Sequence, residues 1–520
     1  RDGVGEYDYV HNSAHVLSFW EQRVKEVAEL DNLYTLGMRG VHDGAMNGAK
    51  TIEEQKAVLT KVLKDQRDLL TKYVNKDVTQ VPQVFIPYKE VLDVYHAGLQ
   101  VPDEVTLMWC DDNYGYIRHF PTAEERARKG GNGVYYHVSY WGRPHDYLWL
   151  GTAHPSLVYQ QMSLAYERGI QKMWILNVGD IKPAEYQVEL FLDMAWNLEE
   201  VKQQGIAAHQ RHFLEREFGK NRADRLQPVM QEAYRLAYIR KPEFMGNTRT
   251  EEKDPKFKVI SDLPWCEQEI NERLAAYRQL SDKVEQEWHA LPAQKKETYF
   301  QLVKYPVQAA AQMNNKLLTA QLARHGKADW ADSDRAYDSI VSLTKTYNTT
   351  KWNRMMDFQP RRLLVFNRVE RKALSSGLLE KPQAVYTWNG ADCVEGASVI
   401  CEGLGYEGKA VAVEKKKELT FEFAAWETDS VEVEVRLLPN HPVEGERLRF
   451  TISLDGSATE AVSYETKGRS EEWKENVLCN QAVRRMILPV ARKASHRLIF
   501  TALDEGVVLD QICLYMPRIK

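Results

Sequence analysis

Apolar residues follow two different periods in the first two hundred positions of the chain. Val16, Trp20, Val24 and Val27 share one face of a helix expected over residues 15–30. Short apolar runs of the kind found in buried strands follow at 33–38, 83–87, 105–109, 133–138 and 172–177. Helical patterns separate or follow these runs at 51–73, 89–96, 156–168 and 184–196. This alternation predicts a parallel sheet with right-handed crossovers.

Two architectures fit such an alternation. Polar and aromatic residues cluster just after each expected strand, as at the catalytic face of a (β/α)8 TIM barrel. A doubly wound sheet is the alternative, but it usually carries a glycine-rich loop between a strand and a helix. The glycines of Gly130–Gly133 stand before a strand instead and indicate a turn. Because a closed barrel needs eight strands, we expect residues 1–204 to hold strands 4 to 8 and the first three to lie upstream of Arg1.

The remainder of the chain predicts further domains. Residues 205–355 carry helical periodicity alone, as in the face formed by Leu274, Tyr277, Leu280 and Val284, and predict a helical bundle. Further helices are expected at 222–239, 296–324 and 332–347. Residues 356–383 are expected to be a linker. Residues 384–520 alternate apolar with polar positions and predict an antiparallel β-sandwich as an accessory domain.

Composition narrows the class of protein. The 520 residues include 69 basic and 74 acidic ones, a net charge of −5, and no long basic block. A nucleic acid or a membrane is therefore not an expected partner. The six cysteines form no C-x-x-C pair, so they are free thiols or, at most, a Cys393–Cys401 bridge. No metal site is expected, because His11 and His15 lack the glutamate of a metalloprotease motif, and no G-x-S-x-G elbow occurs.

Four successive strand ends carry the residues that could do chemistry. They present Arg39 and Asp43, then Tyr88 and Glu90, then Asp111 and Asn113, and finally His137 and Tyr140. On a barrel these points converge on one mouth. Glycoside hydrolysis needs one carboxylic acid to protonate the departing oxygen and a second carboxylate to activate water. Arg39 indicates an acidic sugar, because a guanidinium pairs with a carboxylate through two hydrogen bonds.

Each of these residues also has a structural explanation when it is taken alone. Asp43 could belong to an ordinary turn, and Glu90 could complement the dipole of a helix. His137 in a strand is typical of a structural histidine, and Trp141 is typical of packing. Phe85, Met108 and Trp109 are assigned to the core. Only the recurrence of such residues at consecutive strand ends favours a common site.

Four segments resemble the signature of glycoside hydrolase family 115, the xylan α-1,2-glucuronidases: Leu36–Gly44, Ile86–Val91, Trp109–Gly115 and Tyr136–Gly142. The resemblance implies removal of glucuronic acid, or its 4-O-methyl form, from glucuronoxylan with inversion at the anomeric carbon. It implies Glu90 as general acid, Arg39 at the uronate carboxylate and Tyr88 beside them. Asp43 is the first choice for the base and Asp111 the second.

The resemblance carries further expectations. Asn113, His137 and Tyr140 would hold sugar hydroxyls, and no cofactor is implied. Family members contribute another acidic residue from a strand that precedes Arg1 and have an additional N-terminal domain, so the sequence is expected to be truncated. A molecule that really began at Arg1 would be expected to be inactive. A polysaccharide or oligosaccharide carrying glucuronic acid is the expected partner, arabinogalactan being another credible source. A secreted or periplasmic location and a homodimer are further possibilities.

Two other functions fit the same residues. A substrate-assisted N-acetylhexosaminidase would use adjacent aspartates such as Asp111 and Asp112, but it leaves Arg39 unexplained. A carbohydrate-binding protein without activity would use the β-sandwich.

Overall fold

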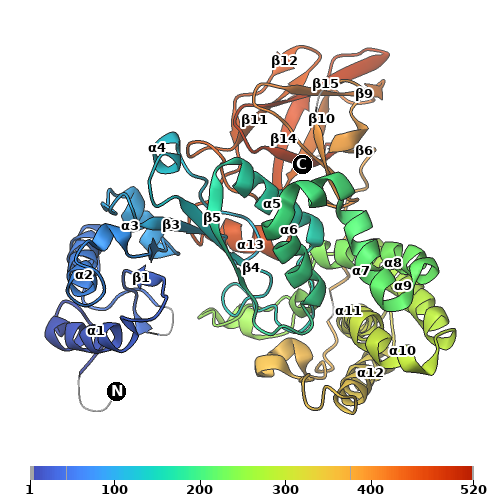
Figure 1. Ribbon diagram of the computed structural model, residues 1–520. Helices are drawn as coiled ribbons and strands as arrows, with labels where there is room; N and C mark the ends of the chain where they lie inside the picture. Colours follow the sequence, from blue (N-terminus) through green and yellow to red (C-terminus); the bar gives the residue numbers. More distant parts are fainter. Residues whose placement is uncertain (1–4, 42–43, 375, 397, 518–520) are drawn as a thin grey trace. The chain divides into compact units, whose positions relative to one another are not determined.

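The computed structural model describes residues 5–41, 44–374, 376–396 and 398–517 (Figure 1). These residues form two compact units, which are described separately. The first comprises Arg1–Asp112, Ile117–Tyr136 and Ser163–Ile175, so far as they are described. The second comprises Asn113–Tyr116, His137–Met162 and Leu176–Lys520, with the same limit.

A five-stranded sheet in the order β1-β2-β3-β4-β5 forms the centre of the N-terminal region. Its strands are β1 (Tyr34–Leu36), β2 (Gln83–Phe85), β3 (Thr106–Cys110), β4 (Asn132–His137) and β5 (Ile170–Asn177). The pairs β1–β2, β2–β3 and β3–β4 are parallel. Phe85, Met108 and Trp109 are buried, as expected for the core. The predicted α/β region is confirmed, with each strand within about three residues of its expected place.

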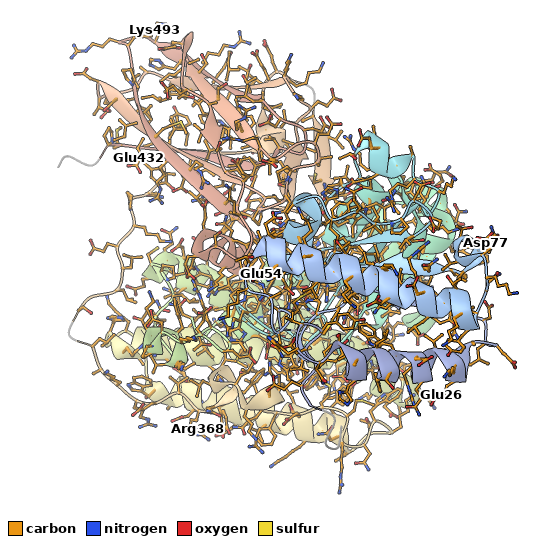
Figure 2. All side chains as sticks on the ribbon, turned by 90° about the vertical axis from the view of Figure 1, so that its left-hand side faces the viewer. Glu26, Glu54, Asp77, Arg368, Glu432 and Lys493 are labelled. Atoms are coloured by element: carbon orange, nitrogen blue, oxygen red, sulfur yellow. The ribbon has the colours of Figure 1, made fainter. Side chains whose placement is uncertain are left out.

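Helices α1 (Ser13–Val27), α2 (Ile52–Tyr73), α3 (Glu90–His96) and α4 (Ala123–Arg126) accompany the sheet in the first unit. Helix α2 begins at Thr51, whose hydroxyl accepts from the backbone N–H of Glu54 while the Glu54 carboxylate accepts from that of Thr51. It buries one apolar face and packs against α1, β1 and α3. Figure 2 shows α1 and α2 side by side, with the exposed Glu26 and Glu54 near their ends.

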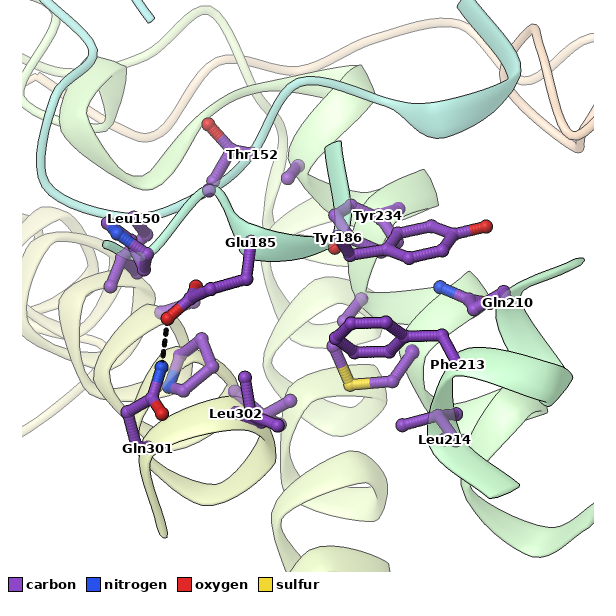
Figure 3. Close-up of a pocket in the computed structure, with 18 residues that line it drawn as sticks. Leu150, Thr152, Glu185, Tyr186, Gln210, Phe213, Leu214, Tyr234, Gln301 and Leu302 are labelled. Atoms are coloured by element: carbon purple, nitrogen blue, oxygen red, sulfur yellow. Dashed lines mark hydrogen bonds between the residues drawn. The ribbon is translucent and has the colours of Figure 1, made fainter. Parts of the chain in front are cut away.

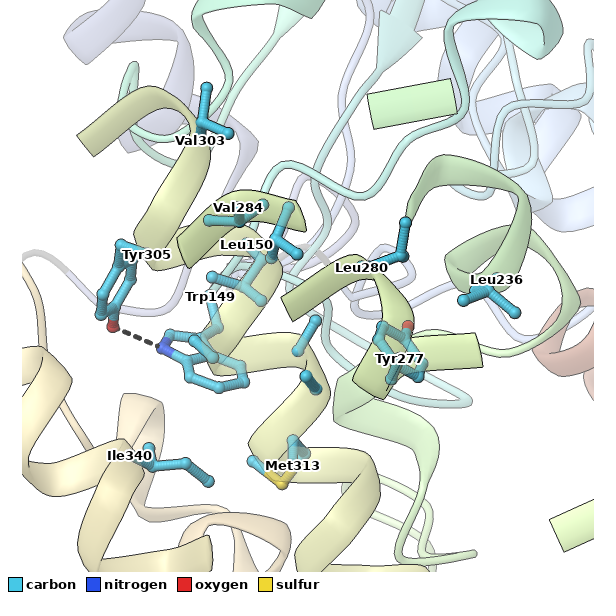
Figure 4. Packing of buried hydrophobic residues seen from close by; sticks show 14 of the residues in the cluster. Trp149, Leu150, Leu236, Tyr277, Leu280, Val284, Val303, Tyr305, Met313 and Ile340 are labelled. Atoms are coloured by element: carbon cyan, nitrogen blue, oxygen red, sulfur yellow. Dashed lines mark hydrogen bonds between the residues drawn. The ribbon is translucent and has the colours of Figure 1, made fainter. Parts of the chain in front are cut away.

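A helical region forms the centre of the second unit. Its helices are α5 (Pro155–Glu167, whose last turns belong to the first unit), α6 (Glu185–Gln204), α7 (Ile206–Phe218), α8 (Lys220–Ile239), α9 (Glu267–His289), α10 (Ala293–Tyr299), α11 (Tyr305–Arg324) and α12 (Trp330–Asn348). Helix α11 is buried along almost its whole length and packs against α9 and α12. In this core the Trp149 indole donates to the Tyr305 hydroxyl over 3.1 Å (Figure 4).

One helix expected over 296–324 is divided in the structure. A π-helical turn over Phe300–Lys304 separates α10 from α11. Pro306 stands at the beginning of α11. Proline has no N–H to donate and its ring clashes with the carbonyl four residues earlier, so the regular helix is interrupted just before it.

The C-terminal region consists of two antiparallel sheets that share one apolar core. One sheet has the order β14-β10-β16-β8-β7 with β6 beside β16, and the other β12-β11-β15-β9 with β13 beside β11. The strands are β6 (Tyr386–Asn389), β7 (Val399–Glu402), β8 (Lys409–Ala412), β9 (Glu418–Ala424), β10 (Ser430–Leu437), β11 (Arg449–Leu454), β12 (Ser457–Ala458), β13 (Val462–Ser463), β14 (Ala482–Pro489), β15 (Ser495–Ala502) and β16 (Val508–Tyr515). The antiparallel prediction is confirmed, but helix α13 (Glu471–Cys479) was not foreseen.

The six cysteines are all free thiols, so the bridge considered between Cys393 and Cys401 is not formed. Within the described ranges, none of the helices has both the length and the apolar character needed to cross a bilayer.

Candidate active site

Arg39 and Glu90 form an ion pair in the first unit. Arg39 follows β1 and Glu90 opens α3 after β2, and the parallel register sets Leu36 opposite Phe85. The Arg39 Nε donates to Glu90 Oε1 and Nη2 donates to Oε2, each over 2.8 Å. This is the two-bond pairing of a guanidinium with an ionised carboxylate. The predicted meeting of these two strand ends is therefore observed.

Tyr88 completes this group. The Arg39 guanidinium carbon lies 5.0 Å from the centre of the Tyr88 ring. The intervening Lys89 has φ +52°, an uncommon left-handed conformation for a residue other than glycine. That sharp turn takes the chain from Tyr88 directly into α3, where Glu90 is the first helical residue. A cation, an anion and an aromatic ring thus share a half-buried surface.

Asp111 and Asp112 are buried carboxylates directly after β3. Asp111 pairs with Ile117 in an isolated bridge that closes the intervening loop. Burial, together with the charges of Asp111 and Asp112, raises the pKa of Tyr136 well above its usual range. The two carboxylates are therefore near the Tyr136 phenol. Asp43, the first choice for the base, lies outside the described residues.

Asn113, His137 and Tyr140 belong to the second unit. Asn113 adopts φ +73°, and its carbonyl accepts a 2.5 Å hydrogen bond from the Tyr147 hydroxyl. Tyr140 pairs with Tyr147 through both backbone hydrogen bonds. The His137 and Tyr140 rings meet edge to face with centroids 5.8 Å apart. The loop after β4 thus holds His137 and Tyr140 together.

Residues from distant parts of the second unit support this loop, and the sequence pattern did not indicate them. Trp473 of α13 packs edge to face on Tyr114 at 5.8 Å. Arg469 donates to the Tyr140 hydroxyl over 3.5 Å. The ring cluster is completed by Tyr147 and Phe244.

A second group lies around Trp141, and its members Arg361 and Asp146 were not indicated by the sequence. Trp141, for which packing was the structural alternative, has a side chain that is 63% exposed. The Arg361 guanidinium carbon lies 4.0 Å from the Trp141 ring centre and pairs with the buried Asp146. Burial raises the pKa of Asp146 to about 6, and the nearby charge of Arg361 opposes that rise. Arg361 stands in the segment expected as a linker, so no local pattern could place it here.

Two further features of the second unit are structural in character. Glu189, Asp193 and His209 are close enough to share a cation, but Arg216 donates to both oxygens of Glu189 and already neutralises its charge. A mostly apolar pocket of about 60 Å³ is lined by residues of the helical region such as Tyr186 (Figure 3). That is well below the roughly 150 Å³ of a cavity that holds benzene, so the pocket is too small for a sugar ring.

A carboxylate-pairing arginine, buried acids and aromatic side chains after successive strands of a parallel sheet are features of an enzyme that acts on glycosides. Comparisons with known families specify the class. The model of Glycosyl hydrolase family 115 matches residues 1–244, and that of the Glycosyl hydrolase family 115 C-terminal domain matches residues 397–520. The chain belongs to glycoside hydrolase family 115.

Solved structures agree with this assignment. A family GH115 4-O-methyl-α-glucuronidase, BtGH115A, described as specific for decorated arabinogalactans, is 68% identical with a TM-score of 0.97. The match covers 99% of this chain and 68% of that one. A family 35 carbohydrate-binding module from an environmental isolate matches 25% of this chain and 93% of its own at 11% identity. Its TM-score of 0.21 is too low to carry a functional argument. No curated protein matches the sequence.

Proposed function

We propose that this protein is an α-glucuronidase that removes glucuronic acid, or its 4-O-methyl form, from the side chains of a plant polysaccharide. The observation that carries the proposal is the Arg39–Glu90 pair beside Tyr88. A guanidinium that already pairs with a carboxylate has the geometry needed for a uronate. The 68% identity to an enzyme described as acting on decorated arabinogalactans favours that polymer, with glucuronoxylan as the second candidate.

In the proposed reaction Glu90 is the general acid and the anomeric centre inverts. The Glu90 proton passes to the glycosidic oxygen as the bond from that oxygen to C1 breaks, and water attacks C1 from the opposite face. Asp43, or Asp111 in its place, takes the proton of that water. The products are the β-anomer of the uronic acid and a free hydroxyl on the polymer. Asn113, His137 and Tyr140 hold sugar hydroxyls in this proposal.

The ion pair requires an exchange before Glu90 can act. While both Glu90 oxygens accept hydrogen bonds from Arg39, this side chain cannot donate to a glycosidic oxygen. The uronate of the substrate can take over the Arg39 fork, because it offers the same geometry. Glu90 is then released from its two hydrogen bonds to Arg39 and can face the glycosidic oxygen. Substrate binding would in this way prepare the acid.

The test is NMR detection of the uronic acid released from arabinogalactan and from glucuronoxylan. We expect release from arabinogalactan to be faster and the β-anomer to appear first. Glu90→Gln should lower kcat by about 10²–10⁴-fold, the usual contribution of a general acid. It should leave polymer binding largely intact. Arg39→Lys is the matched control, because it keeps a charge but loses the paired donors.

Three results would contradict the proposal: full activity of Glu90→Gln, equal losses on uronic-acid and neutral glycosides in Arg39→Ala, or an α-anomer as the first product. Polymer binding without turnover by the unaltered protein would favour a carbohydrate-binding role instead. Strong inhibition by a thiazoline would favour an N-acetylhexosaminidase.

The wider expectations form part of the same proposal. The in-order sheet and the polar residues after its strands support assignment to a (β/α)8 barrel. We also propose a secreted or periplasmic location, since such a polymer lies outside the cell, and a homodimer, which sedimentation would test. The boundaries 1–204, 205–355, 356–383 and 384–520 remain our proposed division into barrel, bundle, linker and sandwich.

A further inference from the structure

Trp141 is an exposed indole in a loop that otherwise buries its aromatic residues. It follows the end of β4 by four residues and is 63% exposed, whereas Tyr140, Tyr147 and Trp149 are buried. An exposed tryptophan brings no hydrophobic stabilisation in proportion to its size. Contacts with other residues must therefore hold the Trp141 ring in its place next to Tyr140.

An ion pair between the partly exposed Arg361 and the buried Asp146 supports one side of the ring. The Arg361 guanidinium lies over the indole at 4.0 Å, well within the range of a cation–π contact. The same guanidinium pairs with Asp146, whose side chain is 2% exposed. The backbone N–H of Gly142 donates to Asp146 Oδ1 over 2.6 Å. Trp141 therefore stands on a support that is itself fixed in the interior.

The backbone is constrained on both sides of the contact between Trp141 and Arg361. Arg361 has φ +52°, which costs energy for a residue with a side chain. At Gly142, a Cβ atom would lie 2.2 Å from the Tyr140 hydroxyl, so only glycine allows Tyr140 to pack where it does. Arg361 thus has an uncommon backbone conformation, and the loop has no space for a side chain at Gly142.

Two carboxylates offset the positive charge of Arg361. Arg361 pairs with Asp146 and also lies 3.5 Å from the Glu251 carboxylate. A uronate would gain little attraction here, in contrast to Arg39. The guanidinium lies over one face of the indole, and the residue as a whole is 63% exposed. A neutral ligand with an apolar face fits that surface.

We propose that Trp141, supported by Arg361 and Asp146, is a binding site for a neutral sugar of the polysaccharide. The pyranose ring of that sugar stacks on the open face of the indole. The C–H groups on one face of a galactopyranose carry partial positive charge and suit the negative face of an aromatic ring. The subsite rests on the proposed function, and it names a galactosyl unit of the aglycone polymer as the recognised sugar.

The first experiment compares two substrates of the full protein. Arabinogalactan contains the aglycone sugar, and α-glucuronyl fluoride does not. For Trp141→Ala we expect kcat/KM on arabinogalactan to fall at least tenfold more than kcat/KM on the fluoride. Trp141→Phe should recover part of the loss, because it restores an aromatic face. Trp196→Ala is the matched control, an exposed tryptophan on α6 that should change neither value.

The second experiment measures binding without turnover. Isothermal titration with β-1,3-galactotriose should show at least tenfold weaker binding to Trp141→Ala than to Trp196→Ala. Arg361→Ala should weaken binding as well, because the indole loses its support. If the protein releases no uronic acid but this pattern of binding is found, the proposed function fails and the subsite stands. Equal binding by Trp141→Ala and Trp196→Ala, or equal losses on both substrates, would overturn the subsite.

Discussion

At the scale of single residues, the chemical behaviour of a side chain depends on the groups it contacts. Arg39 and Glu90 carry opposite charges in a two-bond pair, so each determines what the other can do. A histidine far from them in the sequence shows the same dependence. His154 is buried, and its Nδ1 accepts a 3.1 Å hydrogen bond from the backbone N–H of Ser156. That nitrogen therefore carries no proton, and the imidazole is neutral.

His154 should make the fold sensitive to acid. Burial lowers its pKa from 6.5 to about 3, so between these values the unfolded chain binds a proton that the folded one does not. The contribution of His154 to the free energy of unfolding is fully present above pH 6.5. Below that pH it falls by about 1.4 kcal/mol per pH unit. His154→Asn keeps an acceptor for Ser156 and removes the titration, so unfolding curves from pH 7 to 4 should show a shallower decline.

An exposed histidine provides the control for that measurement. His15→Asn, on the surface of α1, should leave the pH dependence of stability as it is. An unchanged slope in His154→Asn would mean that His154 does not remain neutral in the folded protein.

At the scale of elements, boundaries follow local sequence, whereas position depends on distant partners. The π-helical turn before α11 has a local cause in Pro306. Helix α13 depends both on its local sequence and on distant partners. It is capped by Ser470, whose hydroxyl accepts from the backbone N–H of Trp473. Distant ion pairs then fasten it, since Arg249 donates to Glu471 over 2.6 Å and also contacts Glu475.

Trp473 should be the main anchor of α13. Its side chain is almost completely buried against the ring cluster that supports Tyr140. Trp473→Ala should lower the free energy of unfolding by about 3–5 kcal/mol, whereas Ser470→Ala, which removes only the cap, should cost about 1 kcal/mol. Denaturant unfolding followed by circular dichroism compares the two variants. A smaller effect of Trp473→Ala than of Ser470→Ala would show that α13 is only loosely attached.

At the scale of the whole molecule, the segment 356–383 does more than connect two domains. Val365 and Phe366 are buried in the core of the helical region. The Phe366 ring meets the Trp149 indole edge to face at 5.1 Å. The same segment carries Arg361 to Trp141. It thus links the helical core to the loop after β4.

Two phenylalanines of this segment give a direct test of that role. Phe366 is 2% exposed, and Phe358 is 40% exposed. Phe366→Ala should cost about 3–5 kcal/mol of unfolding free energy, and Phe358→Ala should change it by less than about 1 kcal/mol. Thermal unfolding of the two variants makes the comparison. Similar, small effects of both substitutions would show that the segment acts as a passive connection.

The sequence by itself determined the strands and helices and the strand ends that carry the candidate site residues. Strands and helices follow from periods of two and 3.6 residues, which are local properties of the chain. Parallel neighbours place their ends together, so Arg39 and Glu90 could be expected to meet. Only the tertiary structure decided that Arg361 and Trp473 support the loop after β4, more than two hundred residues away along the chain. Such contacts depend on how whole elements pack, and no local repeat encodes that packing.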